Sequence, residues 1–298
     1  DMTNKLRWGT QKNYYTTQKY ILKFIKKQFN TSDMYLKQLD YNFILKFEKF
    51  LKEYQPLDHQ KKMGNNSVMK HIERFRKMIT LSFKLEWIGR APFINFKAKF
   101  EKVERGYLSI KELEHIEEKQ FSIPRLQLVK DLFIFSCYCG LSYIDVINLT
   151  EENINLGIDG ELWIIKKREK TNKLLRIPIL PKAKILIDKY KVHPKSEING
   201  TIFPKISNQK LNSYLKEVAD VCSIKKNLTF HLARHTFATT VTLTNGVPIE
   251  TVSQLLGHSR ISTTQIYAKV IERKVSNDME DLRKKLEIHN FKKQKEQS

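Results

Sequence analysis

The sequence predicts a mainly helical protein of two domains, with a small antiparallel β-sheet in the second domain. Through most of the chain, apolar residues recur at spacings of three and four, the period of an amphipathic helix. Between residues 157 and 181, short runs of isoleucine and leucine are bounded by glycine and proline, a pattern typical of strands. The 298 residues, 41% of them hydrophobic, suffice for two modest cores.

The first domain, residues 1–94, is predicted to contain three helices with basic outer faces. Asp40 stands where it would cap the second helix, and Asn66 or Ser67 would start the third, which Pro92 would end. Each helix carries one apolar stripe. In chain order the stripes are Tyr20, Ile21, Phe24 and Ile25; Ile44, Phe47 and Leu51; and Val68, Ile72, Phe75, Ile79 and Phe83.

A charged linker is predicted at residues 95–106, followed by a second domain at 107–272 and a terminal helix or tail at 273–298. Ser109 and Glu112 have the spacing of a capping box, which marks the start of the next helix. The following apolar run, Arg125–Cys139, predicts a buried helix that ends near Gly140.

Two strands, 162–165 and 174–180, are predicted to form the sheet. Lys170 falls in the turn between them. Helices are expected again after Pro181, and Gly257 is expected to end one of them.

The charge balance indicates the kind of partner. Lysine and arginine number 54 against 32 aspartate and glutamate, a formal net charge of +22 spread along the chain. So large an excess favours a polyanion, and DNA or RNA fits best. An anionic membrane surface is the weaker alternative, since no stretch approaches the roughly 20 apolar residues of a spanning helix. An AT-rich genome is the other explanation for the abundant lysine.

Cysteine usage points to a reducing cytoplasm, because Cys137, Cys139 and Cys222 are too few for a disulfide framework. No His/Cys grouping has the spacing of a zinc site, and we expect neither metal nor cofactor. The chain opens without a signal-peptide pattern and with Asp1 instead of Met, which is compatible with a fragment of a longer protein.

Residues suited to phosphate chemistry gather in the segment 229–270. His231 and Arg234 are three residues apart and so share one face of a helix. His258 directly follows a glycine that ends a helix, and Tyr267 comes nine residues later. Each of these residues alone would be explained by packing or solvation; the combination favours a catalytic site.

Transfer of a phosphodiester needs an oxygen nucleophile, and the hydroxyl of Tyr267, on a helix that Ser262 would cap, can serve. Preorganised arginine and histidine donors stabilise the charge that builds on the non-bridging oxygens. A lysine such as Lys170 can protonate the leaving oxygen. His235 is instead expected to be structural, with a hydrogen bond inside its helix.

These motifs resemble the catalytic region of the tyrosine recombinase (phage integrase) family, and a weaker similarity extends over the whole chain. The resemblance implies a two-domain DNA clamp, with a helical core-binding domain and an α+β catalytic domain. It also implies that Tyr267 forms a 3′-phosphotyrosyl bond while Arg234, His231 and His258 hold the phosphate.

The resemblance assigns the general acid to Lys170, which stands eight residues before Pro178, the register of the family's hairpins. Lys173 is the rival candidate. One position departs from the family's pattern: Ser142 occupies the place of an arginine, whereas Asp145 matches the acidic residue that supports the site. Since a hydroxyl supplies no fixed charge, we expect a lysine or arginine from elsewhere to fill the gap.

The Gly-Leu-Ser variant resembles integrases on mobile elements of Bacteroides-like bacteria. The implied function is site-specific integration, excision or inversion at double-stranded attachment sites in the nucleoid, by a homotetramer on DNA, with accessory DNA-bending or directionality factors as possible partners. The sequence leaves the reaction direction and the DNA site open. Two alternative functions remain. One is a type IB topoisomerase-like enzyme. The other is a DNA-binding protein that has lost catalysis, and Ser142 at the usual arginine position is the feature that supports it.

Overall fold

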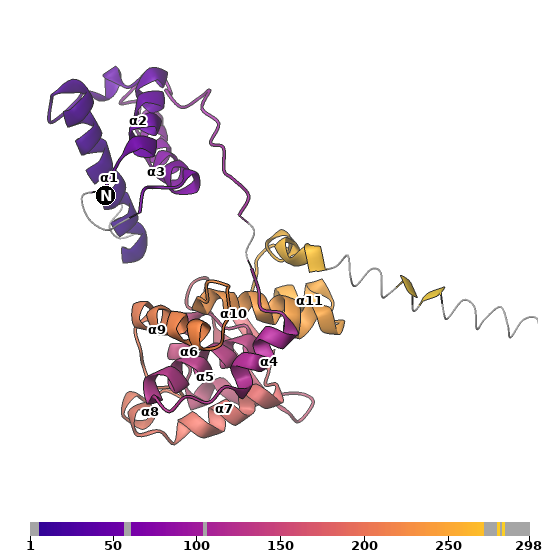
Figure 1. The fold of residues 1–298 in the computed structure, drawn as a ribbon. Helices are drawn as coiled ribbons and strands as arrows, with labels where there is room; N and C mark the ends of the chain where they lie inside the picture. The colour runs from indigo at the N-terminus through magenta and orange to yellow at the C-terminus, as the bar shows by residue number, and fades with distance from the viewer. Residues whose placement is uncertain (1–5, 57–60, 104–105, 271–278, 281, 284–298) are drawn as a thin grey trace, which may run out of the picture. The chain divides into compact units, whose positions relative to one another are not determined.

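The computed structural model describes residues 6–56, 61–103, 106–270, 279–280 and 282–283 (Figure 1). The chain divides into two compact units, residues 1–104 and 105–298, and this division falls inside the predicted linker. The predicted fold class is confirmed, because the described part is mostly helical and holds a small antiparallel sheet. The predicted tail, 273–298, lies almost wholly outside the described residues.

Unit 1 is built from helices that bury most of their predicted apolar stripes. They are α1 (Trp8–Phe29), the short 3₁₀ helix η1 (Leu36–Gln38), α2 (Tyr41–Glu53) and α3 (Asn65–Lys84). The side chain of Asp40 accepts a hydrogen bond of 2.7 Å from the backbone N–H of Phe43, which confirms the predicted cap. Phe24 and Phe47 lie in an aromatic core, and burying each ring stabilises the unit by about 1.5–3 kcal/mol.

The end of α3 differs from the prediction. The helix begins at Asn65, one residue before the expected start, and ends at Lys84, well before Pro92. Glu86 adopts a left-handed conformation with φ 60°, and the N–H of Trp87 bonds to the carbonyl of Ser82. This is a Schellman termination without its usual glycine, so the sequence carried no signal for it. Phe83, predicted to be buried, lies in this last turn and is 42% exposed.

Part of the segment predicted as a linker packs on unit 1. Phe96 is buried in the core of this unit. The side-chain amides of Asn65 and Asn66 donate hydrogen bonds to the carbonyls of Lys99 and Glu101.

In unit 2 the helices surround α5, which contacts α4, α7, α9 and α10 (Figure 1). Cys137 and Cys139 are fully buried in α5, as predicted, and Gly140 ends this helix with φ 69°. The Ser109–Glu112 capping box is confirmed at the start of α4. The α-helices are α4 (Ile110–Glu118), α5 (Pro124–Cys139), α6 (Tyr143–Ile147), α7 (Pro181–Lys191), α8 (Pro194–Asn199), α9 (Asn208–Val221), α10 (Phe230–Thr236) and α11 (Ile249–Leu255).

Short 3₁₀ and π elements complete unit 2. The π-helix η3 continues α10 directly, an arrangement often found near functional sites. These elements are the 3₁₀ helices η2 (Glu151–Asn153), η4 (Leu243–Asn245), η5 (Ile261–Thr263) and η6 (Gln265–Val270), and the π-helix η3 (Phe237–Thr242).

The sheet in the described residues has the order β1-β2-β3, with both pairs antiparallel. Strand β2 (Leu162–Lys167) is two residues longer than predicted, and β3 (Leu174–Pro178) ends two residues earlier. Strand β1 (Ile154–Leu156) was not predicted, because it has three residues and no fully buried position. The hairpin between β2 and β3 contains Lys170, as expected.

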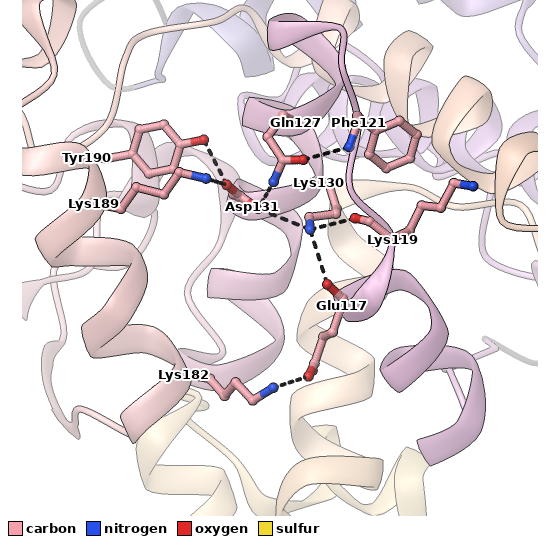
Figure 2. Close-up of polar contacts among 9 residues, drawn as sticks. All are labelled: Glu117, Lys119, Phe121, Gln127, Lys130, Asp131, Lys182, Lys189 and Tyr190. Carbon is pink, nitrogen blue, oxygen red and sulfur yellow. Dashed lines mark hydrogen bonds and ion pairs between the residues drawn. The ribbon is translucent and has the colours of Figure 1, made fainter.

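Two charged residues lie buried side by side on α5, and Figure 2 shows how they are satisfied. Lys130 and Asp131 are each 3% exposed. Lys130 Nζ donates to the carbonyls of Glu117 and Lys119 at the end of α4. The carboxylate of Asp131 accepts from Lys189 Nζ at 2.6 Å and from the Tyr190 hydroxyl at 2.9 Å, both on α7. The pair therefore joins three helices of unit 2.

Candidate active site

Helix α10 holds Arg234 in a fixed position inside unit 2. Arg234 is 2% exposed, and its Nη1 donates to the carbonyl of Gly140 at 2.5 Å while Nη2 donates to the carbonyl of Leu256. A side chain at Gly140 would collide with the ring of Phe237, so glycine is needed where this ring packs against the end of α5. The result is a preorganised cation held by main-chain acceptors.

His231, one turn earlier on α10, is exposed to solvent. Its ring lies edge-on to that of His235, with centroids 4.6 Å apart. The helix thus offers an exposed imidazole at His231 and a buried guanidinium at Arg234.

His258 lies after α11, among several cationic groups. Its Nδ1 is 2.8 Å from the hydroxyl of Thr264, which is fully buried. Burial, followed by the charges of Arg234, Arg168, Lys173 and His231, lowers the pKa of His258 from 6.5 to about 4. His258 is therefore neutral near pH 7, and the fixed positive charge around it belongs to arginine and lysine.

The β2–β3 hairpin brings two of these cations to the loop of His258. Lys173 Nζ donates to the carbonyl of His258 at 2.8 Å, and Arg168 Nη1 donates to the carbonyl of Gly257 at 3.3 Å. Gly257 has φ +59°, and a Cβ there would press against Leu175, so glycine permits the close approach. Lys170, the predicted general acid, is exposed in the turn.

A buried carboxylate connects Ser142 to this hairpin. The Ser142 hydroxyl donates to Asp145 Oδ2 at 2.5 Å, and the backbone N–H of Glu169 donates to Asp145 Oδ1 at 2.9 Å. Asp145 is fully buried at the start of α6. Ser142 thus lies near the end of β2, where Arg168 leaves the strand.

Tyr267 is buried, at 7% exposure, in a cluster with Phe237 and Leu256. Its hydroxyl oxygen lies 2.6 Å from His235 Nδ1. The expected helix capped by Ser262 is wrong: Ser262 lies inside η5, and Tyr267 lies in the separate 3₁₀ helix η6. His235, expected to be structural, thus makes a hydrogen-bond contact with the predicted nucleophile.

The pKa of Arg234 responds to several neighbouring groups of this site. Burial and the charge of Arg168 lower the pKa of Arg234 to about 10, while Tyr267 and Asp145 act in the opposite direction. Of the predicted set, unit 2 gathers His231, Arg234, His258 and Tyr267. Their catalytic roles remain predictions.

Sequence reasoning missed Arg168 and His235 as candidate site residues. The sequence feature that could have pointed to these two residues is their closeness to predicted site residues: Arg168 stands two positions before Lys170, and His235 directly follows Arg234. Within the described residues, no group of three or more His, Cys, Asp or Glu side chains has the arrangement of a metal site. Nor does any described helix have the length and apolar character needed to cross a membrane.

Two family models match the chain. The phage integrase SAM-like domain matches residues 1–100, and the phage integrase family matches residues 112–274. The first match covers nearly all of unit 1, and the second includes every candidate site residue of unit 2.

The curated relatives match about half of the chain. It is 33% identical over 142 residues to tyrosine recombinase XerD of Pseudomonas putida, covering 44% of this chain and 46% of that protein. It is 28% identical over 175 residues to tyrosine recombinase XerC of Thermodesulfovibrio yellowstonii, covering 54% and 56%. The chain thus spans about half the length of these curated relatives.

Solved structures are similar over most of the chain. A lambda integrase dimer bound to a COC′ core site has a TM-score of 0.68 and 18% identity, covering 89% of this chain and 90% of that chain. The XerH site-specific recombinase bound to a palindromic difH substrate has a TM-score of 0.67 and 16% identity, covering 90% and 78%. At such identities the likeness shows the fold alone.

Proposed function

The chain belongs to the phage integrase family, and we propose that it is a site-specific tyrosine recombinase that cleaves and rejoins DNA through Tyr267. The observation that carries this proposal is the gathering of Arg234, His231 and His258 with Tyr267 in one unit. Phosphoryl transfer by an oxygen nucleophile needs such preorganised donors around the developing charge.

In the proposed reaction, the Tyr267 hydroxyl attacks the scissile phosphate and forms a 3′-phosphotyrosyl bond. Arg234, His231 and His258 bind the non-bridging oxygens, and Lys170 protonates the departing 5′ oxygen. The 5′ hydroxyl of another strand then attacks the phosphotyrosine and reseals the DNA. Because the phosphotyrosyl bond conserves the energy of the broken phosphodiester, the cycle needs no nucleotide hydrolysis.

Arg168 is the cation that we propose takes the place left by Ser142. Three observations support this assignment. Arg168 donates to the backbone carbonyl of Gly257, beside His258, and its charge lowers the pKa of both Arg234 and His258. Asp145 accepts hydrogen bonds both from Ser142 and from the backbone of Glu169, the residue after Arg168. Arginine also suits the task chemically, because its planar fork binds two phosphate oxygens at once.

The proposed substrates are double-stranded attachment sites of a mobile element, bound in the cytoplasm at the nucleoid. We propose that four protomers assemble on DNA, because exchange of both strands between two duplexes requires four cleavages. Accessory DNA-bending or directionality factors would select among integration, excision and inversion.

The proposal is tested with a nicked suicide duplex that carries an attachment site from the DNA flanking the gene. The wild-type chain should form a covalent complex with this duplex, and Tyr267→Phe should bind it without forming that complex. A type IB topoisomerase-like enzyme would cleave without joining two differently labelled duplexes. A wild-type chain that binds DNA without any covalent complex would establish the non-catalytic alternative.

A further inference from the structure

The proposed nucleophile already has a buried partner for its hydroxyl. The Oη atom of Tyr267 lies 2.6 Å from Nδ1 of His235, and the two rings are tilted with centroids 5.3 Å apart. His235 is 3% exposed and Tyr267 7% exposed. In the proposed reaction, Arg234, His231 and His258 bind the phosphate and Lys170 acts on the 5′ oxygen, so the tyrosine proton still needs an acceptor.

We propose that His235 is the general base for Tyr267. In the neutral imidazole that carries its proton on Nε2, Nδ1 is an acceptor, and the tyrosine hydroxyl donates to it. The contact then links the proton to be removed directly to the group that removes it. This inference rests on the proposed recombinase function.

The proton and bond changes balance in both directions. As Tyr267 Oη forms its bond to phosphorus, its proton passes to His235 Nδ1, and the bond from phosphorus to the 5′ oxygen breaks. Lys170 supplies a separate proton to that 5′ oxygen. During resealing the incoming 5′ hydroxyl gives its proton to Lys170, and the imidazolium of His235 returns a proton to the departing tyrosine oxygen.

The surroundings of the contact favour a base supplied by the protein. Tyr267 packs in the apolar cluster of η3 and α11 with Phe237, Val252 and Leu256, so bulk water has little access to its ring. A buried hydroxyl that must lose its proton there depends on an acceptor held at hydrogen-bond distance.

The neighbouring histidines are engaged differently. His258 holds Thr264 through its own Nδ1, and His231 is exposed at the edge of the His235 ring. Exposure suits His231 to binding the phosphate as it arrives. Arg234 donates to two carbonyls and remains a cation, so it offers no acceptor.

The test compares His235→Asn and His235→Phe with the wild-type chain on the nicked suicide duplex, under single-turnover conditions. Asparagine can accept a hydrogen bond but cannot take the proton, and phenylalanine preserves the packing alone. We expect the rate of covalent-complex formation to fall on the order of 10²-fold or more in both variants, with DNA affinity unchanged. His115→Asn, an exposed site on α4, is the matched control and should react at the wild-type rate.

A fluorinated tyrosine at position 267 distinguishes a base from a packing residue, because it changes the acidity of the hydroxyl and leaves the packing of His235 unchanged. The fluorinated hydroxyl is more acidic and therefore depends less on a base. It should raise the rate of covalent-complex formation more in His235→Asn than in the wild-type chain. Nitrogen-15 NMR of the wild-type histidines, which does not depend on the folding of a variant, should show His235 protonated on Nε2.

The outcomes distinguish failure of the recombinase function from failure of the role assigned to His235. If the wild-type chain forms no covalent complex, the recombinase function itself fails. If it reacts and His235→Asn reacts equally fast, or if fluorotyrosine does not restore the slow variant, His235 is not the base. Protonation of His235 on Nδ1 would overturn the inference as well.

Discussion

Arg168 reaches the candidate site from the end of β2, and its guanidinium is only partly engaged there. Nη1 contacts the carbonyl of Gly257, whereas Nε is buried and has no hydrogen-bond partner among the described residues. Because a guanidinium has five N–H donors, Arg168 retains donors for an arriving phosphate. A buried donor without a partner is costly in a folded protein, and we propose that phosphate binding engages the remaining donors of this guanidinium.

We therefore predict that Arg168→Gln slows covalent-complex formation on the suicide duplex by roughly 10²-fold, the cost of losing one preorganised donor. Arg168→Lys should recover part of the rate, since it restores the charge without the planar fork. The control is Lys167→Gln, an exposed position at the end of β2. Equal rates for Arg168→Gln and the wild-type chain would show that the cation replacing arginine lies elsewhere.

The residues in motifs were predictable, but their partners were not. Motif spacing, together with the resemblance to the family, selected His231, Arg234, His258 and Tyr267, whose catalytic roles stay predictions. The contact between His235 and Tyr267 was not predicted, because it depends on how η6 packs against α10. Such packing leaves no trace in local sequence.

At the scale of the elements, the buried pair Lys130–Asp131 determines how α4, α5 and α7 fit together (Figure 2). Tyr190 shares in this arrangement: burial, followed by the charge of Asp131 and the hydrogen bond to it, raises its pKa. The network is concentrated on α5, which the sequence predicted only as an apolar helix.

Replacing Asp131 by asparagine should destabilise unit 2 strongly. The change removes the negative charge beside Lys130 and Lys189, and losing one partner of a buried pair typically costs about 3–5 kcal/mol. Urea denaturation followed by circular dichroism measures the loss. Lys182→Met is the control, because its ion pair with Glu117 involves a lysine side chain that is 56% exposed, and such pairs contribute about 0–1 kcal/mol. A similar loss in both variants would contradict this ranking.

Element ends were harder to predict than element identities. Asp40 and the Ser109–Glu112 pair gave correct starts because their side chains bond to backbone N–H groups that helices leave unsatisfied. The end of α3 had no such marker, since Glu86 takes the left-handed position where glycine is usual. The edge strand β1 also lacked a pattern, because it has no core-facing alternation.

For the whole molecule, each unit contains a histidine that resists protonation. Burial, reinforced by Arg74, lowers the pKa of His71 to about 4 in unit 1, where its Nδ1 bonds to Thr17. His258 has a pKa lowered to about 4 in unit 2. Both groups would titrate near 6.5 in the unfolded chain, so between pH 6.5 and 4 the unfolded state binds more protons.

The chain should therefore lose stability in both units as the pH falls from 6.5 toward 4, and gain nothing from these two histidines above that range. Urea unfolding at pH 7 and pH 5, followed by circular dichroism, measures the effect. His71→Asn should reduce the pH dependence, whereas His115→Asn, at an exposed site, should not. Stability that is constant or rises on acidification through this window would refute the assignment.

Arg234 is anchored by two carbonyls of the main chain and not by carboxylate side chains. A carbonyl acceptor is present whatever amino acid occupies its position. Codon changes at the acceptor positions therefore cannot delete the anchor directly; they reach it only by displacing the backbone, as a side chain at Gly140 would. The orientation of this arginine is thus robust to most single mutations, and sequence drift around the site can be extensive before its geometry is lost.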